Sequence, residues 1–460
     1  KFLSFFSVIL SKLKKKIIIY LVVKMKIPNE FANRMKNIIP NYDEFISELD
    51  NDSVKGINVN TNKISISDFK KIFPYQIKKI PYSNNSFYLE ENVKFGNHPY
   101  HHAGLFYSQD PGACMPVNAI TIKDDYKVLD LCASPGGKSI QIAQKLKNGF
   151  LVANEYDKKR SNILYSNIER MGLTNVIVTN SDVESLEKVY KGYFDLVLVD
   201  APCSGEGMFR KNYEAIKNFS IDNINLCVKR QKEILSAAAY MVKTNGFILY
   251  STCTYEIEEN EKMVEWFSQN YNYELKKLND IDKYTVKGFD SYSRRFYPHI
   301  SKGEGQFMAL MQNKNIIDTF IEKRENKCPN NKEKKIIDEF LDNLNIKLDV
   351  KILNNKVFIL AGDVPNNVHI ISSGVQVGEI KNNYFLPNHY LFKAYGEYFK
   401  NKCNLKIGDE RISKYLKGEC IVADVPNGWG VIMVDGYSLG GYKATNKILK
   451  NHYPKGLRNI

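Results

Sequence analysis

The chain has 460 residues, more than one ordinary domain holds, and this length predicts roughly three domains. Hydrophobic residues make up 43% and charged residues 25%, close to the globular average, so a mostly disordered chain is excluded. The 65 Lys and Arg residues outnumber the 51 Asp and Glu residues, and the formal net charge of +14 favours a polyanionic partner, nucleic acid before an anionic membrane.

The first 24 residues differ from the rest, because they carry six lysines and no acidic residue. Their two apolar runs are shorter than the roughly 20 residues that a bilayer span needs. We expect an upstream extension before Met25, with an interfacial basic helix as the alternative. No membrane-spanning segment is expected.

Residues 25–110 mix helix and strand patterns and predict a small α/β N-terminal domain. From 111 to 315, short apolar runs alternate with helical stretches, which predicts an α/β fold with a doubly wound parallel sheet covered on both faces. The expected strands are Lys127–Cys132, Phe150–Glu155, Val176–Thr179, Phe194–Asp200 and Gly246–Thr252, the main expected helices are Lys158–Met171 and Asp222–Val242, and a terminal hairpin is expected over Arg295–Met311. Residues 316–385 are expected to be a polar linker and an intermediate α/β region, and 386–460 a β-rich module with Gly and Asn turns.

A candidate cofactor turn follows the first expected strand of the central domain. Ligands of open α/β sheets bind beyond the carboxyl ends of the strands, and glycine lets the backbone approach a ligand. The turn consists of Cys132, Ala133, Ser134, Pro135, Gly136, Gly137 and Lys138. Glu155 ends the next strand, where an acid can hold ribose hydroxyls, and Asp182 follows the third strand on the adenine side.

Three cofactors compete for this turn. A nucleoside triphosphate is disfavoured because the P-loop pattern needs a glycine where Cys132 stands, and a dinucleotide because Gly-x-Gly-x-x-Gly is absent. S-adenosylmethionine has no phosphate and needs an open turn with carboxylates, so it fits best.

Cysteine usage gives the second functional signal. The eight cysteines contain no Cys-x-x-Cys pair, so we expect reduced thiols in a cytoplasmic protein. We expect six of them to be small buried hydrophobic side chains: Cys114, Cys132, Cys227, Cys328, Cys403 and Cys420. Cys203 and Cys253 differ, because each lies in a polar turn at the end of an expected strand.

If neighbouring strands carry Cys203 and Cys253, both thiols face the crevice in which a cofactor methyl group would lie, and one reaction needs this arrangement. Carbon-5 of a pyrimidine is too electron-poor to attack a methyl sulfonium, but a thiolate that adds to carbon-6 makes carbon-5 nucleophilic. Asp200, just before Cys203, could hold the base through its ring nitrogen and exocyclic amine.

Three motifs carry a resemblance to a known family. They are Asp130–Lys138, Asp200–Lys211 with Cys203, and Tyr250–Tyr255 with Cys253 followed by Glu258–Glu261. These motifs closely resemble the RNA cytosine-5 methyltransferases of the Nop2/Sun group, most closely the bacterial RsmB/RsmF-type ribosomal RNA enzymes. The resemblance covers the chain from Met25 onward, and the His98–Gly104 stretch and the Gly205–Arg210 stretch look like the RsmF branch.

The resemblance implies a role for each matched residue. Cys253 would be the nucleophile, Cys203 would assist breakdown of the covalent adduct, and Asp200 would orient the cytosine and contact the cofactor. The turn Cys132–Lys138, with Glu155 and Asp182, would hold S-adenosylmethionine. Ser134 departs from the small Ala that is common in the family, without an expected consequence. The C-terminal module would be a PUA-like RNA-binding domain.

The resemblance also implies the substrate, cytosines of small-subunit ribosomal RNA, with transfer RNA as the alternative target. A non-catalytic RNA-binding assembly factor is the alternative from another functional class. A cytosine in a paired region would have to be flipped out of its stack. We expect a monomer.

Three histidines and two basic residues are further candidates for binding or packing. His98, His101 and His102 lie close together, but no further ligand completes a metal set nearby, so packing or an RNA contact is favoured over a metal. Arg210 and Lys211 are candidate phosphate contacts.

Overall fold

The structure is a computed structural model that describes residues 27–91, 93–353 and 355–459. The extension or interfacial helix expected over residues 1–24 lies outside these ranges. Within the described ranges, no helix is both long and apolar enough to cross a bilayer.

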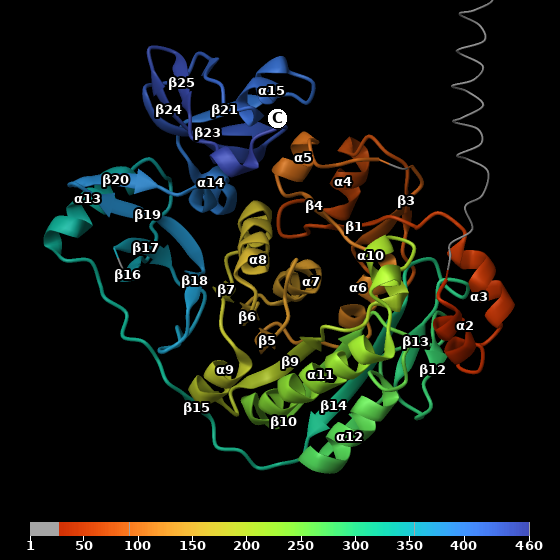
Figure 1. Cartoon of the computed structure of the whole chain (residues 1–460). Coiled ribbons are helices and arrows are strands. Elements are labelled where there is room, and N and C mark those ends of the chain that lie inside the picture. Colours follow the sequence, from red (N-terminus) through yellow and green to blue (C-terminus); the bar gives the residue numbers. More distant parts are fainter. Residues whose placement is uncertain (1–26, 92, 354, 460) are drawn as a thin grey trace, which may run out of the picture.

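A ten-stranded sheet runs through the middle of the described part of the chain (Figure 1). Its path is β12-β13-β14-β10-β9-β5-β6-β7-β18, and β11 pairs with β14. The parallel strands are β5 (Lys127–Asp130), β6 (Phe150–Asn154), β7 (Val176–Thr179), β9 (Phe194–Asp200) and β10 (Val242–Thr252). The antiparallel additions are β11 (Tyr273–Lys276), β12 (Val286–Lys287), β13 (Arg294–Phe296), β14 (Gln306–Asn313) and β18 (Ile370–Ser373). The expected α/β, doubly wound, Rossmann-like fold is confirmed.

Both faces of this sheet are buried, because neighbouring residues of each strand enter different hydrophobic clusters. On β5, Val128 packs in one cluster and Leu129 in the other. The first face is covered by α7 (Gly137–Lys145) and α8 (Lys158–Met171). The second face is covered by α9 (Val183–Val189), α11 (Ile221–Met241) and α12 (Glu261–Tyr271), which lie in the lower part of Figure 1.

Several elements lie where the sequence predicts them. Helix α8 and strands β7 and β9 have the expected bounds, and α11 is shifted by one residue at each end. Strand β10 begins earlier than expected, at Val242, and passes through Asn245 in a left-handed conformation with φ of 62°. The expected terminal hairpin is the antiparallel pair β13–β14.

The N-terminal region divides into two parts. Helices α2 (Asn29–Met35) and α3 (Tyr42–Leu49) pack against the central domain, where Phe31 and Phe45 contact Tyr255. The second part is a sheet of order β2-β3-β1-β4. Its elements are β1 (Gly56–Val59), α4 (Ile66–Ile72), β2 (Ile77–Lys79), β3 (Ser86–Leu89), α5 (Pro99–His102) and β4 (Phe106–Ser108), followed by α6 (Pro111–Asn118).

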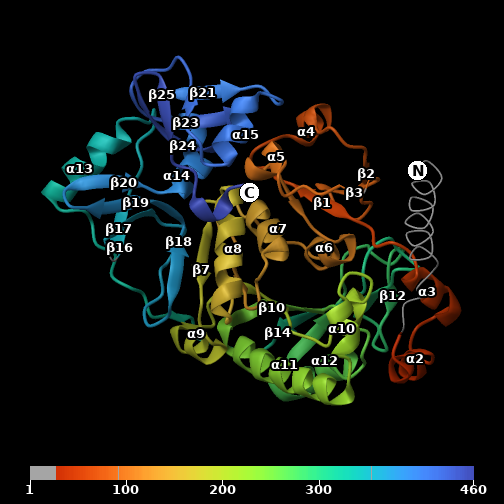
Figure 2. The ribbon, with the colours of Figure 1, turned by 45° about the horizontal axis from the view of Figure 1, so that its top comes forward.

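The C-terminal module is a five-stranded sheet of order β21-β23-β24-β25-β22, in agreement with its predicted β-rich character. Its elements are β21 (Lys402–Leu405), α15 (Glu410–Leu416), β22 (Ile421–Val422), β23 (Gly428–Val434), β24 (Tyr437–Thr445) and β25 (Ile448–Asn451). It shares one hydrophobic cluster with the N-terminal sheet, for example through Phe106 and Tyr442. The two parts lie side by side in Figures 1 and 2 although they are at opposite ends of the chain.

The segment expected as a linker is more ordered than its polar sequence indicates. Strand β15 (Phe320–Ile321) pairs with β8 (Tyr190–Lys191), and α13 (Asn331–Leu341) follows. Four further strands form a sheet of order β16-β17-β19-β20. They are β16 (Lys351–Leu353), β17 (Lys356–Ile359), β19 (Val375–Lys381) and β20 (Tyr384–Pro387), followed by α14 (His389–Tyr395). The segment therefore follows the surface of the central domain and joins its sheet through β18.

Candidate active site

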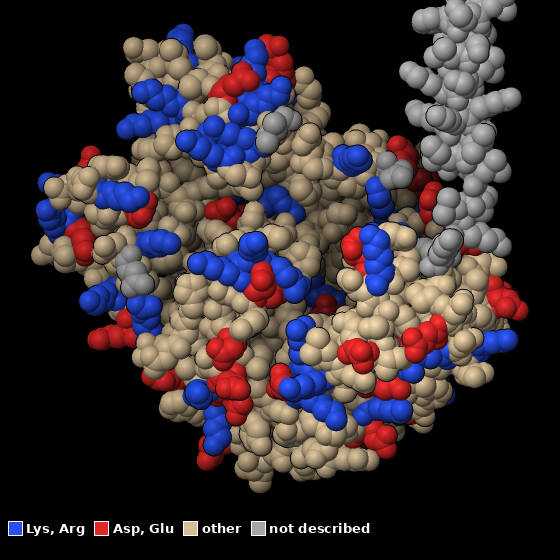
Figure 3. Space-filling view, in the orientation of Figure 1, with Lys and Arg blue, Asp and Glu red and all other residues tan. Residues whose placement is uncertain are grey.

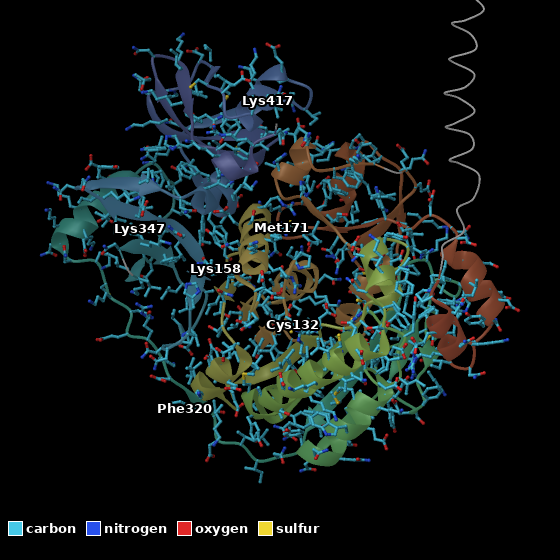
Figure 4. All side chains as sticks on the ribbon, viewed as in Figure 1. Cys132, Lys158, Met171, Phe320, Lys347 and Lys417 are labelled. Carbon is cyan, nitrogen blue, oxygen red and sulfur yellow. The ribbon has the colours of Figure 1, made fainter. Side chains whose placement is uncertain are left out.

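The predicted site residues follow the carboxyl ends of the parallel strands, which meet at one edge of the sheet. The turn after β5 contains Cys132, which Figure 4 shows at the centre of the molecule. The turns after β9 and β10 contain Cys203 and Cys253.

The turn Cys132–Lys138 has the open shape that a close ligand needs. Gly136 has φ of 116°, a conformation that favours glycine, and it precedes α7. The Ser134–Pro135 peptide is cis, and the Ser134 hydroxyl donates a hydrogen bond to the backbone carbonyl of Arg160 (2.9 Å). The serine that departs from the family pattern thus ties the turn to the start of α8.

Two buried acids beside the turn have oxygens without a hydrogen-bond donor among the described residues. Asp130 accepts a hydrogen bond from Ser139 (2.6 Å) through Oδ2, whereas its Oδ1 has no such donor. Burial raises the pKa of Asp130 to about 7. Glu155 is 4% exposed, and its Oε2 accepts no hydrogen bond from a described residue, although the Arg160 guanidinium lies 3.4 Å away.

The third acid, Asp182, lies on the surface. It caps α9 by accepting a hydrogen bond from the backbone N–H of Ser185 (2.7 Å), and this bond lowers its pKa. It lines a cavity of about 540 Å³. Buried carboxylate oxygens without donors, next to an open glycine turn, suit hydroxyl and amine donors, so the site fits S-adenosylmethionine.

The two thiols lie together. The Sγ atoms of Cys203 and Cys253 are 3.3 Å apart, and both residues are half-buried. Their proximity follows from the register of two adjacent parallel strands, in which Asp200 on β9 pairs with Ser251 on β10. The sequence-based expectation that both thiols face one crevice required this adjacency.

Asp200 connects the thiols to the cofactor turn. Its Oδ1 accepts a hydrogen bond from the Ser251 hydroxyl (2.7 Å), and its Oδ2 forms an ion pair with the Nζ of Lys138 (2.8 Å). The Lys138 side chain is 9% exposed, whereas that of Asp200 is 33% exposed. The carboxylate is therefore held in place from inside the protein while part of it faces solvent.

The motif Glu259-Asn260-Glu261 holds the two thiol turns, a function that the sequence analysis did not assign. Glu259 accepts hydrogen bonds from the backbone N–H of Ser204 (3.1 Å) and from its hydroxyl, next to Cys203. Asn260 accepts a hydrogen bond from the Thr252 hydroxyl (2.6 Å) and donates one to the Thr254 carbonyl (3.0 Å), on both sides of Cys253.

Glu261 and Gln231 complete this support. Arg295 donates a hydrogen bond to Glu261 (2.6 Å), which anchors the motif to β13. Gln231 on α11 donates to Glu259 (2.7 Å) and to the Pro202 carbonyl (3.0 Å). The signal in the sequence was the short spacing between Cys253 and these three polar residues. The partners of Asn260 are close in the chain, but those of Glu259 and Glu261 are distant.

The two thiols have different electrostatic surroundings. The hydrogen bond to Cys253, burial and the Glu259 carboxylate all raise the pKa of Cys203 well above its usual value. Burial on its own lowers the pKa of Lys138, but the Asp200 carboxylate and a Cys253 thiolate raise it above its usual value. The surroundings of Cys203 therefore favour its protonated form.

Glu206 is a buried carboxyl group close in sequence to Cys203, and the backbone N–H of the next residue, Gly207, donates a hydrogen bond to the Cys253 carbonyl (2.9 Å). Glu206 is 1% exposed, and neither of its oxygens has a hydrogen-bond partner among the described residues. Burial and the neighbouring Glu259 raise the pKa of Glu206 to about 8, and burial raises that of Glu259 to about 7.

The expectation for the other cysteines is only partly correct. Cys114, Cys227 and Cys403 are buried, and Cys132 is half-buried. Cys328 and Cys420 are exposed, so the prediction that they are buried hydrophobic side chains is wrong. Both lie in irregular segments outside the helices and strands, where their side chains are exposed to solvent.

The stretch His98–Gly104 forms a junction between distant parts of the chain. The side chain of His98 caps α5 by accepting a hydrogen bond from the backbone N–H of Tyr100 (3.1 Å). His102 is buried and hydrogen-bonded to Tyr453 (2.7 Å) and Asn459 (3.0 Å) of the C-terminal module. The His101 ring contacts that of Phe106, with centroids 5.7 Å apart.

Four successive carbonyls at the C-terminal end of this helix each accept a hydrogen bond from a different side chain. They are His101 from Arg170 (2.9 Å), His102 from Lys393 (2.6 Å), Ala103 from Lys63 (3.0 Å) and Gly104 from Asn60 (2.9 Å). The donors belong to the N-terminal region, the central domain and α14. These contacts support the packing interpretation of the histidines. In the described residues, no group of three His, Cys, Asp or Glu side chains could hold a metal ion.

Arg210 cannot contact phosphate as predicted. Its side chain is 1% exposed and forms ion pairs with Glu48 (2.9 Å) and Glu304 (3.1 Å). Both partners come from distant parts of the chain, which is why the sequence did not indicate them. Lys211 is partly exposed and is paired with Asp110.

Comparison with known proteins gives three matches to family models. Residues 117–312 match 16S rRNA methyltransferase RsmB/F, residues 27–111 match the N-terminal domain of 16S rRNA methyltransferase RsmF, and residues 402–459 match the methyltransferase RsmF PUA domain. The three matched ranges leave residues 313–401 between them.

Whole-length relatives share the same name. Ribosomal RNA small subunit methyltransferase F of Vibrio campbellii is 31% identical over 477 residues, which covers 94% of this chain and 97% of that protein. The protein of the same name from Vibrio parahaemolyticus is 30% identical, with the same coverage of both chains.

Solved structures agree on the fold. A methyltransferase homologue from Pyrococcus horikoshii has a TM-score of 0.55 and 28% identity over 63% of this chain and 97% of that one. NSun6 from Pyrococcus horikoshii has a TM-score of 0.56 and 20% identity over 64% of this chain and all of that one, which supports the fold alone. Since relatives are matched over nearly their whole length, this chain belongs to the 16S rRNA methyltransferase RsmB/F family, in its RsmF branch, and S-adenosylmethionine is its cofactor.

Proposed function

We propose that this protein methylates carbon-5 of cytosine in small-subunit ribosomal RNA through a covalent bond between Cys253 and carbon-6 of the base. The observation that carries the proposal is the pair of sulfur atoms, 3.3 Å apart, at the ends of β9 and β10 beside Asp200. S-adenosylmethionine supplies an electrophilic methyl group. The protein must make carbon-5 electron-rich enough to accept it, and a thiolate is the group that can do so.

The surroundings of the thiols support Cys253 as the nucleophile. Two sulfurs at this distance repel each other strongly when both are ionised, so at most one of them carries a negative charge. The hydrogen bond to Cys253 and burial raise the pKa of Cys203 well above its usual value, so Cys203 keeps its proton and Cys253 remains as the nucleophile. This difference gives each cysteine a separate role.

The reaction would pass through a covalent adduct. The Cys253 thiolate would form a bond to carbon-6, and the displaced ring electrons would form a bond between carbon-5 and the methyl group as the bond from that methyl group to the sulfonium breaks, which releases S-adenosylhomocysteine. Water would then take the carbon-5 proton, the ring double bond would form again, and the bond between carbon-6 and Cys253 would break. The Cys203 S–H lies close enough to stabilise the departing Cys253 thiolate by a hydrogen bond.

Asp200 is suited to orient the base. Ser251 and Lys138 fix its carboxylate, and the exposed part can accept a hydrogen bond from the cytosine amine. Cys132–Lys138, Glu155 and Asp182 would hold the cofactor on the adjoining strands, with Glu155 accepting from the ribose hydroxyls and Asp182 from the adenine amine.

The RNA target is supported by charge and by the relatives. The net charge is +14, and Figure 3 shows Lys and Arg side chains on the C-terminal module and across the hollow below it. Such charges bind phosphates without reading sequence. The named relatives are small-subunit ribosomal RNA methyltransferases, and a paired cytosine would have to be flipped into the site.

Methyl transfer to ribosomal RNA by cysteine variants tests the proposal. Cys253→Ala should abolish transfer, and Cys203→Ala should accumulate a covalent protein–RNA adduct that survives denaturing electrophoresis. Cys420→Ala is the matched control, because this thiol is exposed outside the site, and it should behave as wild type. A normal rate in Cys253→Ala would reject the nucleophile.

The modified nucleoside is identified separately. Bisulfite sequencing of ribosomal RNA from a deletion strain should lose one or more 5-methylcytosines and regain them on complementation. Loss in transfer RNA alone would favour the alternative substrate, and no loss in any RNA would favour an assembly factor.

A further inference from the structure

Residues 360–375 lie between the ranges matched by the family models, yet they are attached to the central domain. Strand β18 pairs antiparallel with β7, with Ile370 opposite Thr179 and Ser373 opposite Ile177. Asp363 accepts a hydrogen bond from the Tyr193 hydroxyl (2.7 Å). The segment is therefore fixed beside the strand that carries the third predicted acid.

The turn before β18 is bonded to the loop after β7. The backbone N–H of Asn180 donates a hydrogen bond to the His369 carbonyl (2.9 Å), and the backbone N–H of His369 donates one to the Ser181 hydroxyl oxygen (3.1 Å). These two bonds hold residues 367–369 at a fixed distance from Asp182.

These residues enclose one side of the cavity of about 540 Å³, a size typical of small-molecule sites. Tyr156, Asp157 and Lys158 follow β6, and Asn180, Ser181, Asp182 and Ser185 follow β7. Asn367, Val368 and His369 form the remaining side. Figure 4 shows Lys158, which starts α8, next to this part of the molecule.

We propose that Asn367, Val368 and His369 are part of the cofactor site and form the outer wall of the pocket that receives the adenine ring. The proposal rests on the cofactor placement proposed above, with Asp182 on the adenine side. Tyr156 is 76% exposed at this cavity, so one face of its ring is free to contact a base. The half-buried Val368 offers apolar contact, and the exposed His369 ring offers polar atoms to the ring nitrogens. The amide nitrogen of Asn367 donates to Glu322 (2.6 Å), which leaves its Oδ1 to accept a hydrogen bond from the adenine amine.

Cofactor binding should then depend on the position of the segment 313–401, and the position of the segment on cofactor binding. A ligand that contacts both the β7 loop and residues 367–369 binds only when β18 is in place. Cofactor binding should therefore stabilise β18 on β7, by an amount that grows with ligand concentration.

Titration calorimetry with S-adenosylhomocysteine on the full-length protein tests the wall directly. His369→Ala and Asn367→Gly should each raise Kd by about fivefold or more, a loss typical of one or two contacts. Glycine is chosen because Asn367 has φ of 53°. Asn382→Gly is the matched control, since Asn382 is also exposed with φ of 47° but lies in the β19–β20 turn, and its Kd should stay within twofold of wild type.

Hydrogen exchange on the wild-type protein gives a second readout that needs no variant. Adding S-adenosylhomocysteine should slow exchange in residues 367–373 and leave the β19–β20 hairpin unchanged. Unchanged Kd values in both variants, or no slowing at 367–373, would overturn the proposal. Cys253 does not line this cavity, so a failure of the nucleophile experiment would leave these two results unaffected.

Discussion

At the scale of single residues, the site combines an ion pair with a buried carboxyl group that has no charged partner in the described part of the chain. Lys138 and Asp200 form a largely buried ion pair, whereas Glu206 lies fully buried without a partner among the described residues. A carboxyl group in such surroundings holds its proton to a higher pH than usual.

This leads to a prediction about pH and stability. The pKa of Glu206 rises from its ordinary 4.5 to about 8 in the fold. Between these values the folded state keeps a proton that the unfolded state releases, so the stability contributed here falls as pH rises from about 4.5 to about 8. Glu206→Gln removes this pH-dependent loss of stability, because the amide side chain does not titrate. At pH 8 to 9 we expect the free energy of unfolding of the variant to exceed that of wild type by a few kcal/mol, because one pKa unit corresponds to roughly 1.4 kcal/mol. The variant should therefore melt at a higher temperature.

Thermal unfolding at pH 5 and pH 9 checks this expectation. The difference in melting temperature between the variant and wild type should be smaller at pH 5, because Glu206 is protonated in the folded state at that pH. A difference that does not change with pH would show that Glu206 is not held in its neutral form.

Which residues could be assigned from sequence depended on how far their partners lie along the chain. Cys203, Cys253 and Asp200 stand in short motifs at strand ends, so their proximity followed once the strands were recognised as neighbours. Arg210 looked equally available for RNA, but Glu48 and Glu304 neutralise it from distant segments. Burial of this kind has no local signature.

At the scale of elements, the short helix α5 and the two residues after it join three parts of the protein through four carbonyls: the N-terminal region, the central domain and α14. Helix ends leave carbonyls without partners inside the helix, and here Arg170, Lys393, Lys63 and Asn60 supply the donors. The stretch His98–Gly104, which resembled the RsmF branch, is thus explained by packing.

Asn60 offers a clean test of this junction. It is fully buried, and its side-chain N–H groups donate to the Gly104 carbonyl (2.9 Å) and the Met171 carbonyl (2.9 Å). Asn60→Ala leaves both carbonyls unpaired, so we expect a loss of about 2–5 kcal/mol in the free energy of unfolding. Chemical denaturation measures it.

The control for this experiment is an exposed asparagine. Asn51 donates only to Glu48 at the surface, so Asn51→Ala should stay within about 0.5 kcal/mol of wild type. Equal effects of the two substitutions would contradict the role given to Asn60.

Strands and helices differed in how well the sequence indicated them. Helix α8 and strands β7 and β9 have strong apolar periodicity and lie where expected. Strand β18 was missed, because Ile370–Ser373 is short and half polar and its partner β7 lies far earlier in the chain. Such a strand is defined by tertiary pairing rather than by its own pattern.

At the scale of the whole molecule, the two ends of the described chain share one core. The N-terminal sheet and the C-terminal module contribute to a single hydrophobic cluster, and Tyr100 donates a hydrogen bond to Asp435 (2.8 Å) across the boundary. Two parts with a common core are expected to unfold together.

Tyr453→Ala tests this cooperativity. Tyr453 is 4% exposed and contacts His102 and His389. We expect a loss of about 3–5 kcal/mol and faster hydrogen exchange in β1–β4, which lie far away in sequence. Ile448→Ala, at an exposed position of the same module, should leave exchange in β1–β4 unchanged.

The antiparallel strand β18 also bears on how the protein is made. During synthesis, the whole central domain emerges from the ribosome tens of residues before β18 does. During that interval β7 is an edge strand with unpaired backbone groups, the kind of surface at which nascent chains associate with one another. The late strand thus ends a period of aggregation risk, and chains truncated before residue 370 should be the ones that depend on chaperones.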